Sequence, residues 1–239
     1  MSSEIMFTKD NLDKYLKELG KEFRKLNGTK MPAEIILIGG AAVLARYGFR
    51  EMTYDVDAVI LASSVMKEAI NHVGDRFGLP HGWLNMDFKR TKSFSDKLAQ
   101  VSVYYRMYSN VLTIRTIAAE YLIAMKLMSG RQYKNDLSDV AGILWEHQKN
   151  NDSISIEVIY NAIELLYKDH SGIPVISKTF IDDAFSDGNF ERTYRNIRES
   201  EKQARQDLLN FERDYPKTLK AENIDSILEQ ARKKRVNSD

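Results

Sequence analysis

The segment ILIGGAAVLARYGFREMTYDVDAVI, residues 36–60, constrains the fold more than any other part of the chain. It begins with an Ile-rich apolar run that ends in Gly39-Gly40, which is typical of a buried strand leading into a helix. About two helical turns follow and end at Gly48. The stretch TYDVDAVIL then alternates carboxylates with apolar residues before it becomes wholly apolar. The segment therefore predicts a strand–helix–strand unit.

Two carboxylates begin the second predicted strand. Asp55 and Asp57 are two residues apart, so their side chains project from the same face of a strand. Like charges this close are costly unless a cation neutralises them or one takes up a proton. The pair predicts a Mg²⁺ (or Mn²⁺) site with Asp55 and Asp57 as metal ligands. The alternative is a solvated strand edge on which the charges prevent aggregation.

The paired glycines predict a phosphate site. Gly39 and Gly40 carry no side chains at a strand-to-helix turn, so phosphate oxygens can approach backbone N–H groups at the helix N-terminus. A tight turn without a ligand is the structural alternative. Thr53 is placed to form a hydrogen bond near the metal, and Arg50 to meet phosphates. A phosphate site beside paired carboxylates provides the minimum set of groups for metal-assisted nucleotidyl transfer.

The rest of the chain divides into an α/β part and a helical part. Residues 10–26 and 64–77 have helical spacing, 78–95 has a loop-like composition, and Ser109-Asn110 separates two alternating, β-branched runs that predict a hairpin. Helices are expected over six later segments: 117–129, 136–148, 155–168, 176–185, 190–214 and 222–234. We predict an α/β (α+β) fold with a small mixed sheet in residues 1–115 and a helical region in 116–239. Too few strands alternate with helices for a dinucleotide-binding fold.

Together these motifs resemble the nucleotidyltransferase-fold superfamily, in which Gly-Gly or Gly-Ser, a helix and Asp-x-Asp on the next strand occur in that order. Residues 117–144 are similar to a helical segment of bacterial nucleotidyltransferase-like proteins of abortive-infection and toxin–antitoxin systems. The resemblance assigns phosphate contacts to Lys126, nucleotide binding to Arg131, and completion of the catalytic site to Asp136, with Asp139 one turn on. Arg131 and Asp136 pairing with each other is the structural alternative.

A third acid, which active members of that superfamily commonly carry on a later strand, is missing from both hairpin strands. The nearest acids, Asp87 and Asp96, fall in the predicted loop region. A one-metal enzyme and a nucleotide binder without catalysis therefore both stay open.

Composition excludes several other chemistries. The chain has no Cys and only four widely spaced His, which excludes disulfides, thiolate metal sites and Cys nucleophiles. The net charge is +1, but residues 81–134 carry nine basic residues against three acidic ones, interleaved with aromatics, which suits nucleic acid or nucleotide phosphates. A half-exposed hairpin with core aromatics is the alternative. No apolar stretch is long enough to cross a membrane, so a cytoplasmic protein is expected.

The resulting hypothesis is a bacterial, Mg²⁺-dependent nucleotidyltransferase that moves an NMP from an NTP to an acceptor hydroxyl. The acceptor would be RNA (for example tRNA), a protein or a small molecule. The resemblance further implies a toxin or phage-defence role with an antitoxin as a partner. The alternative is a non-catalytic nucleotide-binding or protein-interaction module.

Overall fold

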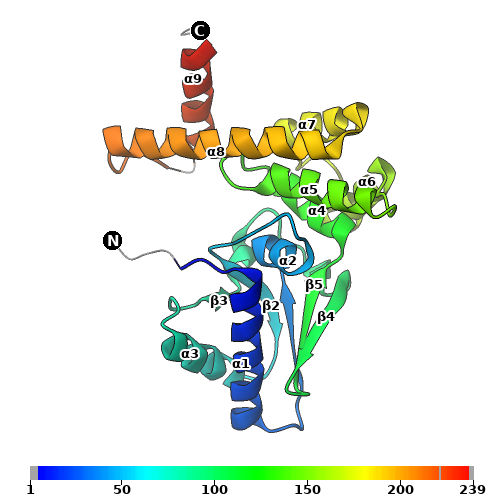
Figure 1. The fold of residues 1–239 in the computed structure, drawn as a ribbon, viewed down its shortest axis with the longest axis vertical. Helices are drawn as coiled ribbons and strands as arrows, with labels where there is room; N and C mark the ends of the chain where they lie inside the picture. The colour runs from blue at the N-terminus through cyan, green and yellow to red at the C-terminus, as the bar shows by residue number, and fades with distance from the viewer. Residues whose placement is uncertain (1–4, 221, 237–239) are drawn as a thin grey trace.

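The computed structural model describes residues 5–220 and 222–236. In Figure 1 a sheet with α1 and α3 forms the lower part of the molecule, and helices lie above it. The described residues contain one five-stranded sheet in the order β3-β2-β1-β5-β4. Its strands are β1 (Ala33–Leu37), β2 (Val56–Leu61), β3 (Leu84–Asn85), β4 (Ser102–Tyr108) and β5 (Leu112–Ile117). Strand β1 is parallel to β5 and antiparallel to β2, so the sheet is mixed, as the sequence predicts.

Nine α-helices lie in the described part of the chain. They are α1 (Lys9–Asn27), α2 (Gly39–Arg46), α3 (Val65–Phe77), α4 (Ala119–Ser129), α5 (Asp136–Lys149), α6 (Ile156–Tyr167), α7 (Val175–Asp187), α8 (Phe190–Asp214) and α9 (Ile224–Val236). Helix α1 packs against α3, while α4 packs against α5, α6 and α7. Helix α8 lies along α5 and crosses the top of Figure 1, and α9 projects from it. The expected helices are confirmed to within a few residues at each end.

The hairpin between β4 and β5 has the predicted turn. Ser109 and Asn110 both have φ 55°, the left-handed conformation that tight hairpin turns favour, and the backbone N–H of Val111 donates to the Tyr108 oxygen at 3.2 Å. Tyr108 faces Leu112 in the ladder, so three residues, 109–111, lie between the paired strands. This part of the sheet follows directly from local sequence.

Three details differ from the sequence prediction. Strand β2 begins at Val56 and not at residue 53, because Thr53 instead pairs with Phe7 through two backbone hydrogen bonds of 2.8 and 2.9 Å. The predicted loop 78–95 contains β3, which pairs in parallel with the start of β2, and the 3₁₀ helix η1 (Asp87–Arg90). Gly39 and Gly40 form the first turn of α2, so Ile38 is the single residue between β1 and this helix.

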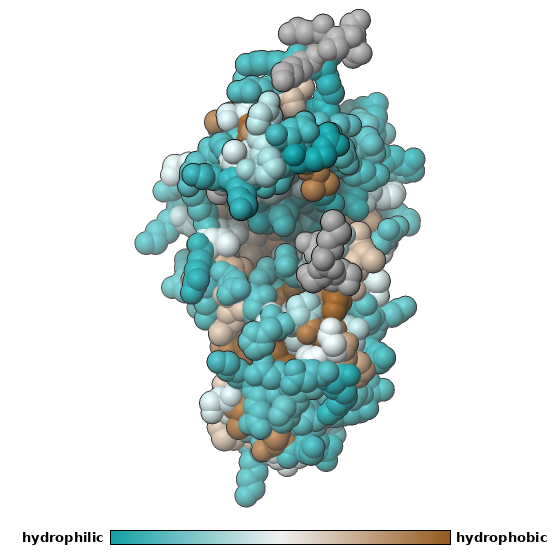
Figure 2. All heavy atoms as spheres, turned by 90° about the vertical axis from the view of Figure 1, so that its left-hand side faces the viewer, coloured by the Kyte–Doolittle hydropathy of each residue, from teal (hydrophilic) through white to brown (hydrophobic). Residues whose placement is uncertain are grey.

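One hydrophobic core joins the sheet to α1–α7 and to the start of α8 at Phe190, and a smaller cluster joins the later part of α8 to α9. The proposed boundary between residues 115 and 116 falls inside β5, and the division into two domains stays a prediction. The face seen in Figure 2 is mainly hydrophilic, with scattered apolar side chains. No helix in the described ranges is both long and apolar enough to span a membrane.

Candidate active site

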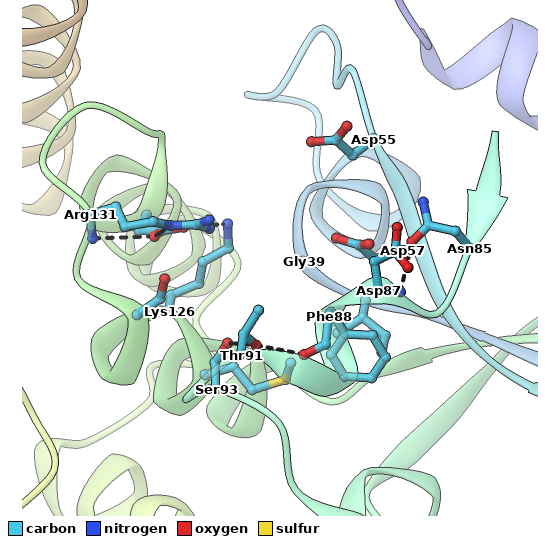
Figure 3. A pocket seen from close by; sticks show the side chains of 14 residues that line it. Gly39, Asp55, Asp57, Asn85, Asp87, Phe88, Thr91, Ser93, Lys126 and Arg131 are labelled. Atoms are coloured by element: carbon cyan, nitrogen blue, oxygen red, sulfur yellow. Dashed lines mark hydrogen bonds and ion pairs between the residues drawn. The ribbon is translucent and has the colours of Figure 1, made fainter. Parts of the chain in front are cut away.

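A pocket of about 330 Å³ lies where the ends of β1 and β2 meet α4 and the start of α5. Carboxylates from the sheet side and cations from the helical side face each other across it (Figure 3). Its volume is in the range of small-molecule sites. The pocket is lined by Ile38, Gly39, Asp55, Asp57, Asn85, Asp87, Phe88, Thr91, Ser93, Met125, Lys126, Ser129, Arg131 and Asp136.

The sheet side of the pocket carries three carboxylates. Asp57 lies in β2 and Asp55 lies just before it, and both line the pocket, as the two-residue spacing predicts. Burial raises the pKa of the half-buried Asp57, and the neighbouring charges of Asp55 and Asp87 raise the pKa further. This wall therefore concentrates negative charge that a bound cation would relieve. We call Asp55, Asp57 and Asp87 the acid wall.

Asp87 reaches the acid wall because of the short strand β3. Asn85 pairs with Asp57 in the parallel β2–β3 ladder, and its side-chain oxygen accepts a 2.8 Å hydrogen bond from the backbone N–H of Asp87. Of the two acids that the sequence offered as a third carboxylate, Asp87 lines the pocket, whereas Asp96 lies in the 3₁₀ helix η2 (Asp96–Ala99) and does not.

The acid wall by itself is not a closed metal cage. Within residues 5–220 and 222–236, no group of three or more His, Asp or Glu side chains is close enough to hold a metal ion on its own. Mg²⁺ commonly binds through one or two carboxylates and takes its other ligands from water and substrate phosphates. Asp55 and Asp57, with Asp87 on the same side of the pocket, fit that mode of binding.

The helical side of the pocket holds a buried charge network. Lys126 of α4 donates to Asp136 at 3.0 Å and lies 2.8 Å from Asp139, both in the first turn of α5. Arg131, whose side chain is 45% exposed, donates to Asp136 at 2.8 Å, and Arg50 pairs with Asp139. Three cations thus share two carboxylates, which leaves a net positive charge. We call Lys126 and Arg131, the pocket-lining cations of this network, the cation wall.

The pKa values in this network follow from its pairing. Burial alone would lower the pKa of Lys126, but Asp139 and Asp136 outweigh it and raise the pKa. Burial alone would raise the pKa of Asp136, but Lys126 and Arg131 hold it well below its ordinary range. Lys126, Arg131 and Asp136 therefore stay ionised at neutral pH, with Asp136 bound by both cations. Arg131 and Asp136 pair with each other, as the structural alternative to nucleotide binding predicts.

The predicted phosphate-binding residues divide into two groups. Gly39, with φ 54°, lines the pocket beside Asp57. Gly40, Arg50 and Thr53 do not line it. The Thr53 hydroxyl donates to the backbone oxygen of Asp55 at 3.2 Å, and Arg50 reaches the pocket only through Asp139 and Lys126. Direct nucleotide contacts by these three residues stay predictions. The catalytic roles of Asp55, Asp57, Lys126 and Asp136 stay predictions as well.

Gly40 has a packing role that can be tested by mutation. A Cβ atom at this position would lie 2.5 Å from Thr53 Oγ1 and 2.8 Å from an Arg50 guanidinium nitrogen. Gly40→Ala is therefore expected to lower the free energy of unfolding by about 1–3 kcal/mol, because the helix must move away from these groups. Urea denaturation measures the change. Gly48→Ala is the matched control, since nothing lies within 4 Å of its Cβ position. Equal stability of the two variants would contradict the expectation.

Several pocket residues have no distinctive sequence signal. Asn85, Thr91 and Ser93 add polar groups to the pocket, and Phe88 adds a largely buried aromatic ring. The Ser93 backbone oxygen is fixed by a 2.7 Å hydrogen bond from the Tyr167 hydroxyl, from a residue 74 positions away. Their placement depends on tertiary contacts that sequence periodicity does not report.

A protein-family model described as "Nucleotidyltransferase of unknown function (DUF6036)" matches residues 14–171. The matched region includes the whole sheet, the acid wall and the cation wall, and it ends after α6. Comparisons with curated proteins and with solved structures give no match.

Proposed function

The chain belongs to this family of nucleotidyltransferases of unknown function, and from that premise we propose that it transfers an NMP from an NTP to an acceptor hydroxyl with the help of Mg²⁺ (or Mn²⁺). The observation that carries the proposal is the pocket in which the acid wall faces the cation wall. A metal–triphosphate complex has the charge pattern that such a pocket complements. The divalent cation would bind the carboxylates, and the negatively charged phosphates would bind Lys126 and Arg131.

In this proposal each residue of the pocket has a separate role. Asp55 and Asp57 would hold the divalent cation, with Asp87 in reach of the same pocket. When bound, such a cation polarises the phosphate and lowers the pKa of the acceptor hydroxyl. Lys126 and Arg131 would bind phosphate oxygens, and Asp136 would hold both cations in place. Gly39 leaves room at the N-terminus of α2 for a phosphate oxygen. The acceptor oxygen would attack the α-phosphorus as pyrophosphate leaves.

The test is a calorimetric titration of each of the four NTPs with and without Mg²⁺, followed by incubation with α-³²P-labelled NTP and candidate acceptors. Metal-dependent binding of an NTP, and label on RNA, protein or a small molecule, are the expected results. Asp55→Asn with Asp57→Asn is the matched loss-of-site variant. Absence of NTP binding, or equal binding without Mg²⁺ and in the double variant, would overturn the proposal.

A second candidate is a nucleotide-binding module without catalysis. It is favoured by one observation: the described carboxylates do not by themselves form a metal site of three ligands. NTP binding with no label transferred to any acceptor would support it. The identity of the acceptor, and a role with an antitoxin in a toxin–antitoxin or phage-defence system, stay predictions from resemblance.

A further inference from the structure

Helix α8 contacts the chain segment that links the two helices of the cation wall. This segment, residues 130–135, joins α4 to α5 and carries Arg131; we call it the α4–α5 connection. Successive turns of α8 contact it and the residues that follow it. Glu201 contacts Leu137 and Ser138, and Arg205 donates to the Asn135 side-chain oxygen at 3.1 Å. Tyr133 packs against the apolar cluster that includes Ala204 and Leu208.

Glu201 makes the most buried of these contacts. Its side chain is 3% exposed, yet all its nearby donors are backbone or hydroxyl groups of α5. One carboxyl oxygen accepts from the backbone N–H groups of Leu137 and Ser138, at 3.1 Å each, and the other contacts the Ser138 hydroxyl. The first N–H groups of a helix have no partner within the helix, so a side chain that accepts from them fixes where the helix begins.

The same helix start carries the acidic partners of the cation wall. Asp136 directly precedes Leu137, and Asp139 directly follows Ser138. Through Asp136 and Asp139, the position of this turn determines where Lys126 and Arg131 are held. Glu201 lies beyond the region matched by the family model, so this support is supplied by a part of the chain that the family description does not cover.

We infer that Glu201 is a positioning residue for the candidate active site, and that α8 holds the α4–α5 connection in the geometry in which Lys126 and Arg131 face the acid wall. The expected effect of Glu201 on NTP binding rests on the proposed function. Its expected effect on the α4–α5 connection rests on the contacts alone. Arg205 and the Tyr133 contact extend the same support along α8.

The charge state of Glu201 suggests a discriminating substitution. Burial raises the pKa of this carboxyl to about 8, the hydrogen bonds from Ser138 oppose the rise, and Asp139 and Asp136 of α5 add to it. Near neutral pH its uncharged form therefore predominates. Glu201→Gln has the same shape and is neutral; its oxygen can accept from both backbone N–H groups, and its amide can donate to the Ser138 hydroxyl. Glu201→Ala removes all three contacts.

The experiment compares Mg²⁺-dependent NTP binding by calorimetry in wild type and three variants of the full chain. Glu201→Ala is expected to weaken binding about tenfold, and Glu201→Gln is expected to stay within about twofold of wild type. Glu199→Ala, an exposed change on α8, should bind like wild type. Wild-type affinity in Glu201→Ala, or an equal loss in Glu201→Gln, would overturn the inference.

Two further measurements separate positioning from loss of stability and from failure of the proposed function. Ile159→Val, a buried change in α6, serves as a destabilised control whose NTP affinity should not change. Hydrogen exchange of residues 130–138 needs no nucleotide. It should be faster in Glu201→Ala than in wild type, and unchanged in Glu201→Gln. If wild type binds no NTP, the proposed function fails. Unchanged exchange in Glu201→Ala would then overturn this inference separately.

Discussion

Asp57→Asn is expected to reduce NMP transfer roughly 1,000-fold, because in the proposed function it removes a metal ligand and with it several kcal/mol of transition-state stabilisation. The same substitution should raise the melting temperature of the ligand-free protein. The reason is that burial and the charges of Asp55 and Asp87 disfavour the ionised form of Asp57, and asparagine is neutral. Label transfer and thermal melting measure the two effects.

The pH dependence of this gain in stability has a defined sign. The folded-state pKa of Asp57 lies above its ordinary value of 3.8, so ionisation above that pKa costs folding free energy. The gain from Asp57→Asn should therefore be present at neutral pH and vanish below about pH 4, where both side chains are neutral. Asp75→Asn, an exposed change on α3, is the control and should alter neither quantity. A melting temperature that falls in Asp57→Asn would show that the carboxylate serves the fold and not a ligand.

Asp136→Ala is expected to lower the free energy of unfolding by about 3–5 kcal/mol, the usual cost of removing one partner from a buried ion pair. Asp136 is 1% exposed and is contacted by both Lys126 and Arg131, so its loss leaves a surplus of buried positive charge. Urea denaturation at pH 7 measures the change. NTP binding should also weaken, because Arg131 then loses its carboxylate partner and Lys126 keeps only Asp139.

Acid titration distinguishes this ion-pair effect from simple loss of packing. The pKa of Asp136 is lowered in the folded state, so its contribution to stability is present above its ordinary value of 3.8 and is lost as pH falls below it. The difference between wild type and Asp136→Ala should therefore narrow below about pH 4. Lys126→Met is the comparison: Asp136 keeps Arg131 and Asp139 keeps Arg50, so its stability should fall less. A pH-independent difference would contradict the ion-pair explanation.

Local sequence patterns predicted the β1–α2–β2 unit, the Ser109-Asn110 hairpin and the later helices, because hydrophobic periodicity and turn residues act over short distances. They also predicted that Asp55 and Asp57 share one side of a strand; both line the pocket, although Asp55 lies just before β2. They did not give β3, since a strand of two residues has no periodicity to detect. Without β3, Asp87 was indistinguishable from Asp96 as a candidate third acid.

For the cation wall and its acidic partners, the sequence predicted which residues take part but not how they pair. The sequence resemblance singled out Lys126, Arg131 and Asp136, but the pairing of Arg50 with Asp139 joins residues 89 positions apart. Glu201 joins Ser138 across 63 positions and had no motif of its own. Contacts of this range depend on how helices pack, which a single sequence does not specify.

The distribution of the two walls along the chain has a consequence for biosynthesis. The acid wall lies in residues 55–87, the cation wall in residues 126–131, and the helix that supports the cation wall begins at Phe190. Since a nascent chain grows at roughly 5–20 residues per second, several seconds separate the emergence of Asp136 and Glu201 from the ribosome. During that interval the acid wall and the cation wall have been synthesised, but the helix that contacts the α4–α5 connection has not. Until α8 has emerged, the α4–α5 connection lacks the contacts from Glu201 and Arg205. If α8 positions this connection as inferred, an incomplete chain is expected to bind NTP more weakly than the full chain.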